Sequence, residues 1–241
     1  MIYDVLVIGA GSGGLAAAKA AAGYGARVAI AEPKQLGGTC VNRGCIPKKL
    51  MVQAAAFVEQ QRIAQAHGWV NPEGLFDWQT LKVAMAQHLE KLRQSQKQTL
   101  QAAGVEILSA AARFVDAHTV AVGDLEVKAE HIIIAAGSRP TLPEIPGIEL
   151  ALTSDDMFEL EQLPGHVVIV GGGYIGVEFS CLLAQLGTQV TLIDTDPHPL
   201  VIAEVEQEYD LSWELDLQRE IEVEFEGRIV FIADEVYPSA M

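Results

Sequence analysis

Two cysteines, Cys40 and Cys45, lie close together in the string GGTCVNRGCIPKK, residues 37–49. Such a pair can form a disulfide only if one turn of helix or an equally tight bend brings the two sulfur atoms together. A helix that begins here would lower the pKa of a thiol through its N-terminal dipole, with Arg43 and Lys48 adding positive charge. These features favour a redox-active thiol pair. Zinc ligation and two unrelated buried thiols are the alternatives, although no further Cys or His stands at a spacing typical of a zinc site.

The first of two glycine-rich turns, GAGSGG at residues 9–14, precedes the cysteines. It stands between a predicted strand, residues 5–8, and an alanine-rich predicted helix that ends at Ala22. A second predicted strand, residues 27–31, then leads to Glu32. In this arrangement the glycines permit a tight turn and a close approach to a pyrophosphate, the helix N-terminus attracts its charge, and the acid accepts hydrogen bonds from ribose hydroxyls. The pattern therefore predicts dinucleotide binding.

The same pattern recurs at GGGYIG, residues 171–176. It follows a predicted strand at 167–170 and opens a predicted helix through Leu186, and the next strand, 189–193, ends at Asp194. In both copies the acid lies 23 residues after the first glycine. The repeat predicts an α/β protein with two Rossmann-like, doubly wound βαβ folds and two bound dinucleotides.

The segment between the two copies is mixed. Residues 48–67 and 77–103 read as amphipathic helices, the second with Asp77 as N-cap and Gly104 as terminator. Four short predicted strands, which we interpret as a small antiparallel β insertion, lead into a buried strand at 132–134; they are residues 105–108, 112–115, 120–122 and 125–128. Prolines at 140, 143 and 146 and Gly147 mark the predicted domain boundary.

The cysteine string, with GAGSGG before it and GGGYIGVEF after it, resembles the class I pyridine nucleotide disulfide oxidoreductase family, and within it the glutathione reductases most of all. The resemblance covers residues 1–200. It implies a flavin (FAD)-binding domain at 1–150, incomplete relative to the family, and a partial NAD(P)-binding domain at 151–200. Residues 201–241 form an acidic, divergent tail.

The resemblance also implies roles for single residues. Cys45 would lie nearest the flavin in a charge-transfer contact, and Cys40 would attack the substrate disulfide. Lys48 would pair with Glu178 beside the flavin, although Glu178 read alone is a solvated helix acid. The implied FAD contacts are Gly9, Gly11, Ser12, Gly13, Gly14, Glu32, Thr39, Cys40, Lys48, Ala135 and Gly137. The implied nicotinamide-nucleotide contacts are Gly171, Gly173, Tyr174, Ile175, Gly176, Glu178 and Asp194, with Tyr174 covering the nicotinamide pocket, and no metal is expected.

The implied reaction passes electrons from a nicotinamide through FAD to the Cys40–Cys45 disulfide and on to a small disulfide such as glutathione disulfide. Asp194-Thr195-Asp196 contains no Arg that could bind a 2′-phosphate, and a carboxylate there accepts a hydrogen bond from a free ribose hydroxyl. The second site is therefore predicted to prefer NAD(H) over NADP(H).

The charge of the chain excludes one class of partner. The formal net charge is −16, and residues 201–241 carry 12 Asp or Glu against Arg219 and Arg228. Because nucleic acid is held by clustered Lys and Arg, we expect no nucleic-acid partner. An acid at position 4 and early glycines argue against a secretory signal, and no apolar stretch is long enough to span a membrane, so we expect a cytoplasmic protein.

The tail departs from the family. Members of the family continue with a segment that completes the FAD site and with a dimerisation domain, whose His-Pro motif and Glu form an acid–base pair. The sequence from Val201 onward contains no counterpart of these segments. We therefore expect a C-terminally truncated member without the family's homodimer interface. The alternatives are a catalytically impaired nucleotide-binding remnant, a dihydrolipoamide dehydrogenase-like enzyme and an electron-transfer flavoprotein. Within the tail, residues 221–226 and 228–233 could pair as a hairpin.

Overall fold

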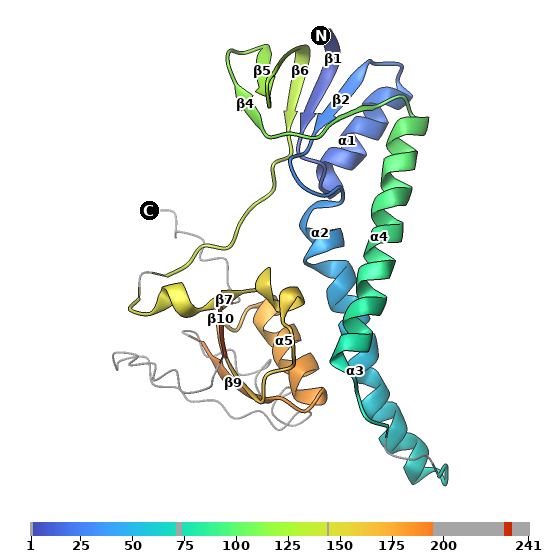
Figure 1. Cartoon of the computed structure of the whole chain (residues 1–241), viewed down its shortest axis with the longest axis vertical. Helices are drawn as coiled ribbons and strands as arrows, with labels where there is room; N and C mark the ends of the chain where they lie inside the picture. Colours follow the sequence, from blue (N-terminus) through green and yellow to red (C-terminus); the bar gives the residue numbers. More distant parts are fainter. Residues whose placement is uncertain (1, 71–73, 144, 195–228, 233–241) are drawn as a thin grey trace. The chain divides into compact units, whose positions relative to one another are not determined.

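The computed structural model describes residues 2–70, 74–143, 145–194 and 229–232. The chain divides into two compact units (Figure 1). The first is made of Met1–Lys48 and Ala84–Ser138, and the second of Lys49–Val83 and Arg139–Met241. The predicted domain limits at residues 150 and 200 stay a prediction.

A six-stranded sheet forms the first unit, in the order β3-β2-β1-β6-β5-β4. β1 is parallel to β2 and β6, and β2 is parallel to β3, whereas β4, β5 and β6 are antiparallel. The strands are β1 (Ile2–Ile8), β2 (Val28–Ala31), β3 (Glu106–Leu108), β4 (Ala112–Phe114), β5 (Thr119–Val122) and β6 (Leu125–Ile134). The α/β class is thus confirmed. The antiparallel insertion consists of β4, β5 and the start of β6, whereas the first of the four strands predicted for it, 105–108, is wrong because β3 pairs parallel with β2.

β6 unites two segments that the sequence predicted as separate strands, 125–128 and 132–134. Its first residues pair with β5, from Leu125 opposite Val122 to Lys128 opposite Thr119. Lys128 is also opposite Ile2, and the rest of β6 pairs with β1 as far as Ile134 opposite Ile8. One continuous strand thus belongs to the antiparallel insertion at its first residues and to the parallel sheet at its last residues.

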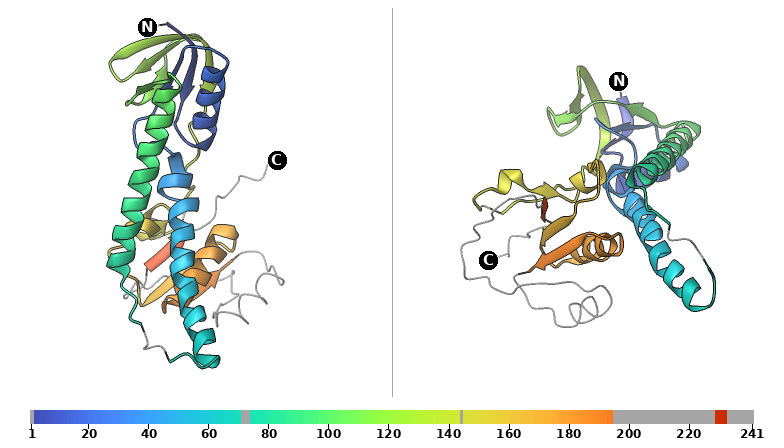
Figure 2. Two further views of the ribbon diagram at one scale, coloured as in Figure 1. Left: turned by 90° about the vertical axis from the view of Figure 1, so that its right-hand side faces the viewer. Right: turned by 60° about the horizontal axis from the view of Figure 1, so that its bottom comes forward.

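The core of the first unit lies on both faces of this sheet. Because successive side chains of a strand point to opposite faces, Leu6 packs with Ala29 and Val120, whereas the next residue, Val7, packs with Ile30. Helix α1 (Ser12–Gly23) covers the second of these faces through Leu15 and Ala18 (Figure 2). Its alanines favour a helix and allow close packing on the sheet.

A second, fully parallel sheet lies in the second unit, in the order β7-β10-β8-β9. Its strands are β7 (Leu152–Thr153), β8 (His166–Val170), β9 (Gln189–Ile193) and β10 (Ile229–Ile232). Helix α5 (Tyr174–Gln185) joins β8 to β9, so the predicted second βαβ unit is confirmed. Phe179 of α5 packs against Phe158, with ring centroids 5.8 Å apart.

β10 corrects the hairpin predicted for the tail. Residues 229–232 lie between β7 and β8 and run parallel to both, so they form an inner strand of the parallel sheet and have no free edge for a hairpin partner. The proposed partner strand, 221–226, lies outside the described residues.

Two long helices lie between the two glycine turns in the sequence. They are α3 (Cys45–Ala66) and α4 (Trp78–Ala102). α3 begins three residues before its predicted start at 48. The Asp77 cap is confirmed, since its carboxylate accepts hydrogen bonds from the Gln79 amide at 2.9 Å and the Thr80 hydroxyl at 2.8 Å. The Trp78 indole N–H donates to the Leu160 carbonyl at 2.9 Å.

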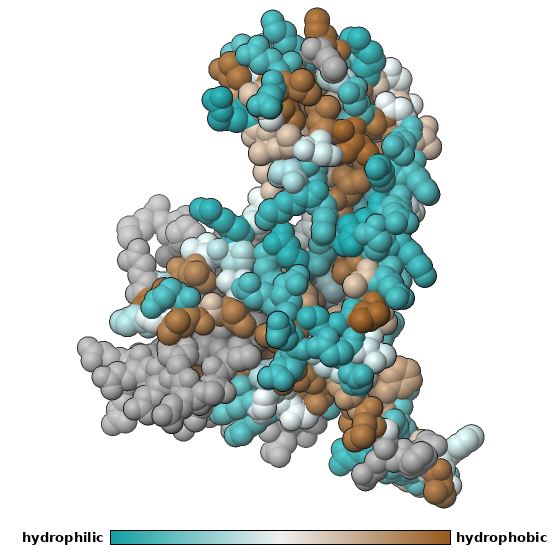
Figure 3. Space-filling model, in the orientation of Figure 1, coloured by the Kyte–Doolittle hydropathy of each residue, from teal (hydrophilic) through white to brown (hydrophobic). Residues whose placement is uncertain are grey.

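α4 is amphipathic, as predicted. Met85, Leu89 and Leu100 are buried at helical spacing, while hydrophilic side chains cover most of the helix surface seen in Figure 3. Two short 3-10 helices, η1 (Ile148–Leu150) and η2 (Asp156–Glu159), follow in the second unit. Among the described helices, none combines the length and the apolar character that a membrane span requires.

Candidate functional site

The first glycine turn connects β1 to α1 and leaves no room for larger residues at two positions. Gly9 has a left-handed φ of 101°, and a Cβ atom on it would lie 2.2 Å from the Ala135 carbonyl oxygen. A Cβ on Gly14 would lie 1.8 Å from the Gly9 carbonyl oxygen. Glycine is therefore required at both, and the contact brings Ala135, at the carboxyl end of β6, against the turn.

The N-terminus of α1 has the geometry of an anion site. Gly11 is the N-cap residue, with extended backbone and no side-chain cap, and Ser12 and Gly13 are exposed. A Cβ on Gly13 would meet nothing within 4 Å, so packing does not demand glycine there. A 12-residue helix whose first turn carries no acid directs its amides and partial positive charge at this end.

Glu32 follows β2 and turns back to the glycine turn. Its carboxylate accepts a hydrogen bond from the Ala10 amide at 2.8 Å and another from the Lys34 amide at 2.9 Å. A carboxylate has further lone pairs, so Glu32 can also accept from ribose hydroxyls. Glu32 thus lies beside the glycine turn, and its role in ribose binding stays a prediction.

The second glycine turn repeats this geometry in the second unit. Gly171 has a φ of 110° and Gly173 is an extended N-cap without a side-chain cap. The Gly171 amide donates to the Ile193 carbonyl at 2.8 Å, as the Gly9 amide donates to that of Ala31 at 2.8 Å. Asp194 lies over the turn, because a Cβ on Gly172 would be 2.1 Å from its Oδ2. The internal repeat seen in the sequence is therefore a structural repeat.

The cysteine loop is docked on the first glycine turn. The Gly37 amide donates to the Ala10 carbonyl at 2.8 Å, and a Cβ on Gly38 would lie 2.6 Å from the Gly11 Cα. Helix α2 (Gly38–Asn42) carries Cys40, and α3 begins at Cys45. The loop therefore lies at the carboxyl ends of β1 and β2, beside the predicted phosphate site.

Cys40 and Cys45 are in contact as thiols. Burial raises the pKa of the Cys40 thiol, and its hydrogen bond with Cys45 raises that pKa further, while a hydrogen bond with Ser12 opposes the shift. The expected lowering of a thiol pKa is thus wrong for Cys40, because burial and the interaction with Cys45 raise it. Within the described ranges, no group of three or more His, Cys, Asp or Glu side chains could hold a metal ion.

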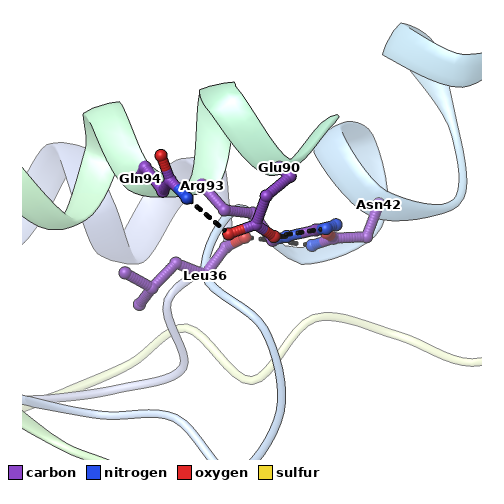
Figure 4. Close-up of polar contacts among 5 residues, drawn as sticks. All are labelled: Leu36, Asn42, Glu90, Arg93 and Gln94. Carbon is purple, nitrogen blue, oxygen red and sulfur yellow. Dashed lines mark hydrogen bonds and ion pairs between the residues drawn. The ribbon is translucent and has the colours of Figure 1, made fainter. Parts of the chain in front are cut away.

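A hydrogen-bond network behind the cysteine loop was missed by the sequence analysis. The Asn42 side chain joins the Leu36 and Gly38 carbonyls to Arg93 of α4, and Arg93 is paired with Glu90 (Figure 4). Arg93 lies 51 residues after Asn42, and no spacing rule connects them.

The remaining predicted residues fall into the two units. Thr39 is exposed, Lys48 is half-buried and Gly137 has a φ of 73° in the first unit. In the second unit, Tyr174 is 78% exposed at the start of α5, Gly176 is buried, and Ile175 and Glu178 are half-buried. The Lys48–Glu178 pair joins residues of different units and stays a prediction.

Comparisons with known proteins agree with these features. Residues 3–235 match the family described as pyridine nucleotide-disulphide oxidoreductase. The chain is 48% identical over 191 residues to a glutathione reductase of Nostoc sp., an alignment that covers 79% of this chain and 42% of that protein. It is 41% identical to a glutathione reductase of Burkholderia cepacia, covering 78% and 42% of the two chains. It is 39% identical to mitochondrial thioredoxin reductase 2 of Drosophila melanogaster, covering 79% and 40%.

Proposed function

The chain belongs to the pyridine nucleotide-disulphide oxidoreductase family, and from this premise we propose that it acts as an NAD(P)H-dependent disulfide reductase of the glutathione reductase type. The family implies FAD and a nicotinamide nucleotide as cofactors. The chain spans 42% of the length of its glutathione reductase relatives, so the whole reductase activity is part of the proposal.

The observation that carries this proposal is the contact of Cys40 with Cys45 beside the first glycine turn. Two thiols that already hydrogen-bond need little backbone movement to reach disulfide geometry. Their neighbour Ser12 belongs to the glycine turn itself, so the pair adjoins the predicted flavin nucleotide site.

The glycine turn at residues 9–14 and Glu32 would hold FAD. The uncapped end of α1 suits a pyrophosphate, and Glu32 suits a ribose. Bound FAD would transfer an electron pair between a nicotinamide and the cysteine pair.

The cysteines would then reduce the substrate by thiol–disulfide exchange. Cys40 gives up its proton, and its thiolate attacks one sulfur of the substrate disulfide, which releases the first thiol. Cys45 gives up its proton and attacks the Cys40 sulfur, which forms the Cys40–Cys45 bond and releases the second thiol. Two electrons and two protons pass to the substrate in total. Because the Cys40 pKa is raised, the first step at neutral pH needs a base to accept its proton.

We propose NAD(H) as the preferred nicotinamide nucleotide. Asp194 directly follows β9 and lies over the second glycine turn, which is where a carboxylate accepts a hydrogen bond from a ribose hydroxyl. A 2′-phosphate in that place would meet the charge of Asp194. Residues 195–200, which could also contribute, lie outside the described residues.

Glutathione disulfide or a similar small disulfide is the proposed substrate, because two of the relatives are named glutathione reductase. A thioredoxin reductase is also among the relatives, so a protein disulfide is the second substrate to assay. A cytoplasmic location belongs to the same proposal.

The visible spectrum of the purified full chain tests the proposed function. Anaerobic NADH should bleach a flavin spectrum and expose two additional thiols per chain, and NADPH should do so less effectively. A Cys45→Ser variant should lose the thiol gain, whereas Cys181→Ser, which changes the cysteine of α5, should keep it. A purified chain without flavin, or an undiminished thiol gain in Cys45→Ser, would overturn the proposal.

A further inference from the structure

The Asn42 side chain holds the backbone just before Cys40. Its amide nitrogen donates to the Leu36 carbonyl at 3.0 Å and to the Gly38 carbonyl at 2.9 Å. Between these two carbonyls lie the left-handed dihedrals of the turn, with φ of 104° at Gly37 and 59° at Gly38. Both donor hydrogens of one amide therefore fix a turn of unusual conformation, and Cys40 is two residues before that amide.

Arg93 of α4 in turn holds the Asn42 amide. Its Nη1 donates to Asn42 Oδ1 at 3.1 Å, which fixes the face of the amide that points to the two carbonyls. Its Nη2 donates to Glu90 Oε2 at 2.7 Å, and Glu90 also accepts from Gln94 at 2.9 Å (Figure 4). The Arg93 side chain is 21% exposed, less than the 52% of Glu90, so the guanidinium is the inner member of the pair.

The charge of Glu90 helps to hold the Arg93 guanidinium in place. The hydrogen bond from Arg93, followed by that from Gln94, lowers the pKa of Glu90, so the carboxylate stays ionised at neutral pH. A charged partner on its outer side holds the guanidinium in one orientation, and its planar fork then serves both Glu90 and Asn42. The network thus joins the part of α4 that belongs to the first unit to the cysteine loop of the same unit.

On the other side of Cys40 the loop is held by packing. A Cβ on Gly44 would lie 3.1 Å from the Thr39 carbonyl oxygen and 3.5 Å from the Cys40 Cα. The chain segment before Cys45 is thus already pressed against Cys40. Asn42, between the two cysteines, is the position from which a side chain can control their approach.

We propose that Arg93 and Asn42 are positioning residues that keep Cys40 within reach of Cys45 and so favour the disulfide over the dithiol. The inference rests on the proposed function, since it takes Cys40 and Cys45 to be the redox pair. Two groups held in reacting geometry have a high effective concentration toward each other, and release of the loop lowers it. The dithiol gains from that release because its two sulfur atoms are not bonded, so the equilibrium moves away from the disulfide.

The test measures the thiol–disulfide equilibrium of the full chain in mixtures of reduced and oxidised glutathione, without any turnover assay. Each conversion takes two electrons and two protons from Cys40 and Cys45 and reduces one glutathione disulfide to two glutathione thiols. After acid quenching and alkylation, mass spectrometry of the peptide that contains both cysteines gives the oxidised fraction.

Two variants interrupt the network at different points. Arg93→Met keeps the apolar part of the side chain next to the backbone and removes its donors, whereas Asn42→Asp keeps a partner for Arg93 and removes both donors to the carbonyls. We expect each to lower the equilibrium constant for disulfide formation about tenfold, which is about 30 mV for a two-electron couple. Arg93→Lys, which retains the charge and a donor, should fall between wild type and Arg93→Met, and it also serves if Arg93→Met does not fold.

Arg62→Met is the matched control. Arg62 pairs with Glu59 at 3.6 Å with the same i,i+3 spacing, but on the exposed surface of α3. It should leave the equilibrium unchanged.

The inference is overturned if the Cys40–Cys45 bond forms and Arg93→Met and Asn42→Asp show the wild-type equilibrium, even if their thermal stability is lower. If the wild-type bond does not form in any glutathione mixture, the proposed function fails together with this extension.

Discussion

Replacement of Gly14 by alanine tests whether the first glycine turn is as tight as described. The added Cβ would lie 1.8 Å from the Gly9 carbonyl oxygen and 3.0 Å from the carbonyl carbon, whereas ordinary contact begins at 3.4 Å. The added Cβ would meet backbone atoms of Gly9, which cannot move aside easily. The Gly9 amide donates a hydrogen bond to Ala31, and the Ala135 carbonyl lies against Gly9. The two atoms must separate by about 1.6 Å, so we expect a cost near the upper end of overpacking, about 3 kcal/mol.

Gly13→Ala is the matched control, because Gly13 lies in the same helical turn and a Cβ there meets nothing within 4 Å. Alanine favours a helix over glycine by up to about 1 kcal/mol, which stabilises Gly13→Ala and offsets part of the cost in Gly14→Ala. The two variants should therefore differ by about 3 kcal/mol, or about 6–12 °C in Tm for a chain of this size.

Urea and thermal unfolding followed by far-UV circular dichroism measure this difference, with both variants stripped of nucleotide so that binding does not contribute. Gly14→Ala should unfold well below wild type and Gly13→Ala at or above it. Equal midpoints for the two variants, or a Gly14→Ala chain as stable as wild type, would refute the close approach of α1 to the turn.

Three further predictions concern single groups. Burial and the 2.7 Å hydrogen bond to Glu106 raise the pKa of Tyr3 to about 12. The stability that the Tyr3 hydroxyl contributes is therefore complete below the ordinary tyrosine pKa and is lost as pH rises through 12. Tyr3→Phe should remove this alkaline dependence of the urea midpoint. The iodoacetamide reactivity of Cys40 should titrate above the pKa of a free thiol, and Cys45→Ala should lower that midpoint only in part because burial is its larger cause; a midpoint below that of free cysteine would contradict this. Gly172→Ala should weaken nicotinamide-nucleotide binding, because the added Cβ would lie 2.1 Å from Oδ2 and 3.1 Å from Cβ of Asp194 and so displace that side chain; calorimetry measures the binding and unfolding curves measure the accompanying loss of stability.

The sequence predicted the parts of the fold that local pattern determines. The glycine turn, the end of α1 and the start of β2 were located to within one residue, because each depends on neighbours within a few positions, whereas β1 begins at Ile2, three residues before its predicted start. The antiparallel insertion was also predicted from alternation and turns. β6 was divided in two because the pattern changes from half-exposed to apolar near residue 130, and the register that makes it one strand is a tertiary property.

The sequence was less informative where distant segments meet. Cys40 and Cys45 were predicted to be close, but the sign of the Cys40 pKa shift depends on burial that their spacing does not reveal. Similarly, the sequence gives no sign of the contact between Arg93 and Asn42, which follows from how α4 lies along the loop. The parallel pairing of residues 229–232 with β8 likewise comes from segments far apart in the chain.

The two nucleotide turns show how one backbone plan accommodates different side chains. In each, the acid that follows the second strand returns to the second residue of the turn, Glu32 to the Ala10 amide and Asp194 to Gly172. Glutamate can reach that amide past the methyl group of Ala10, whereas the shorter aspartate lies where a methyl group on residue 172 would be. The length of the acid and the size of the second turn residue are thus coupled. Since this acid is also the predicted ribose ligand, the coupling would connect a packing constraint within the turn to nucleotide binding.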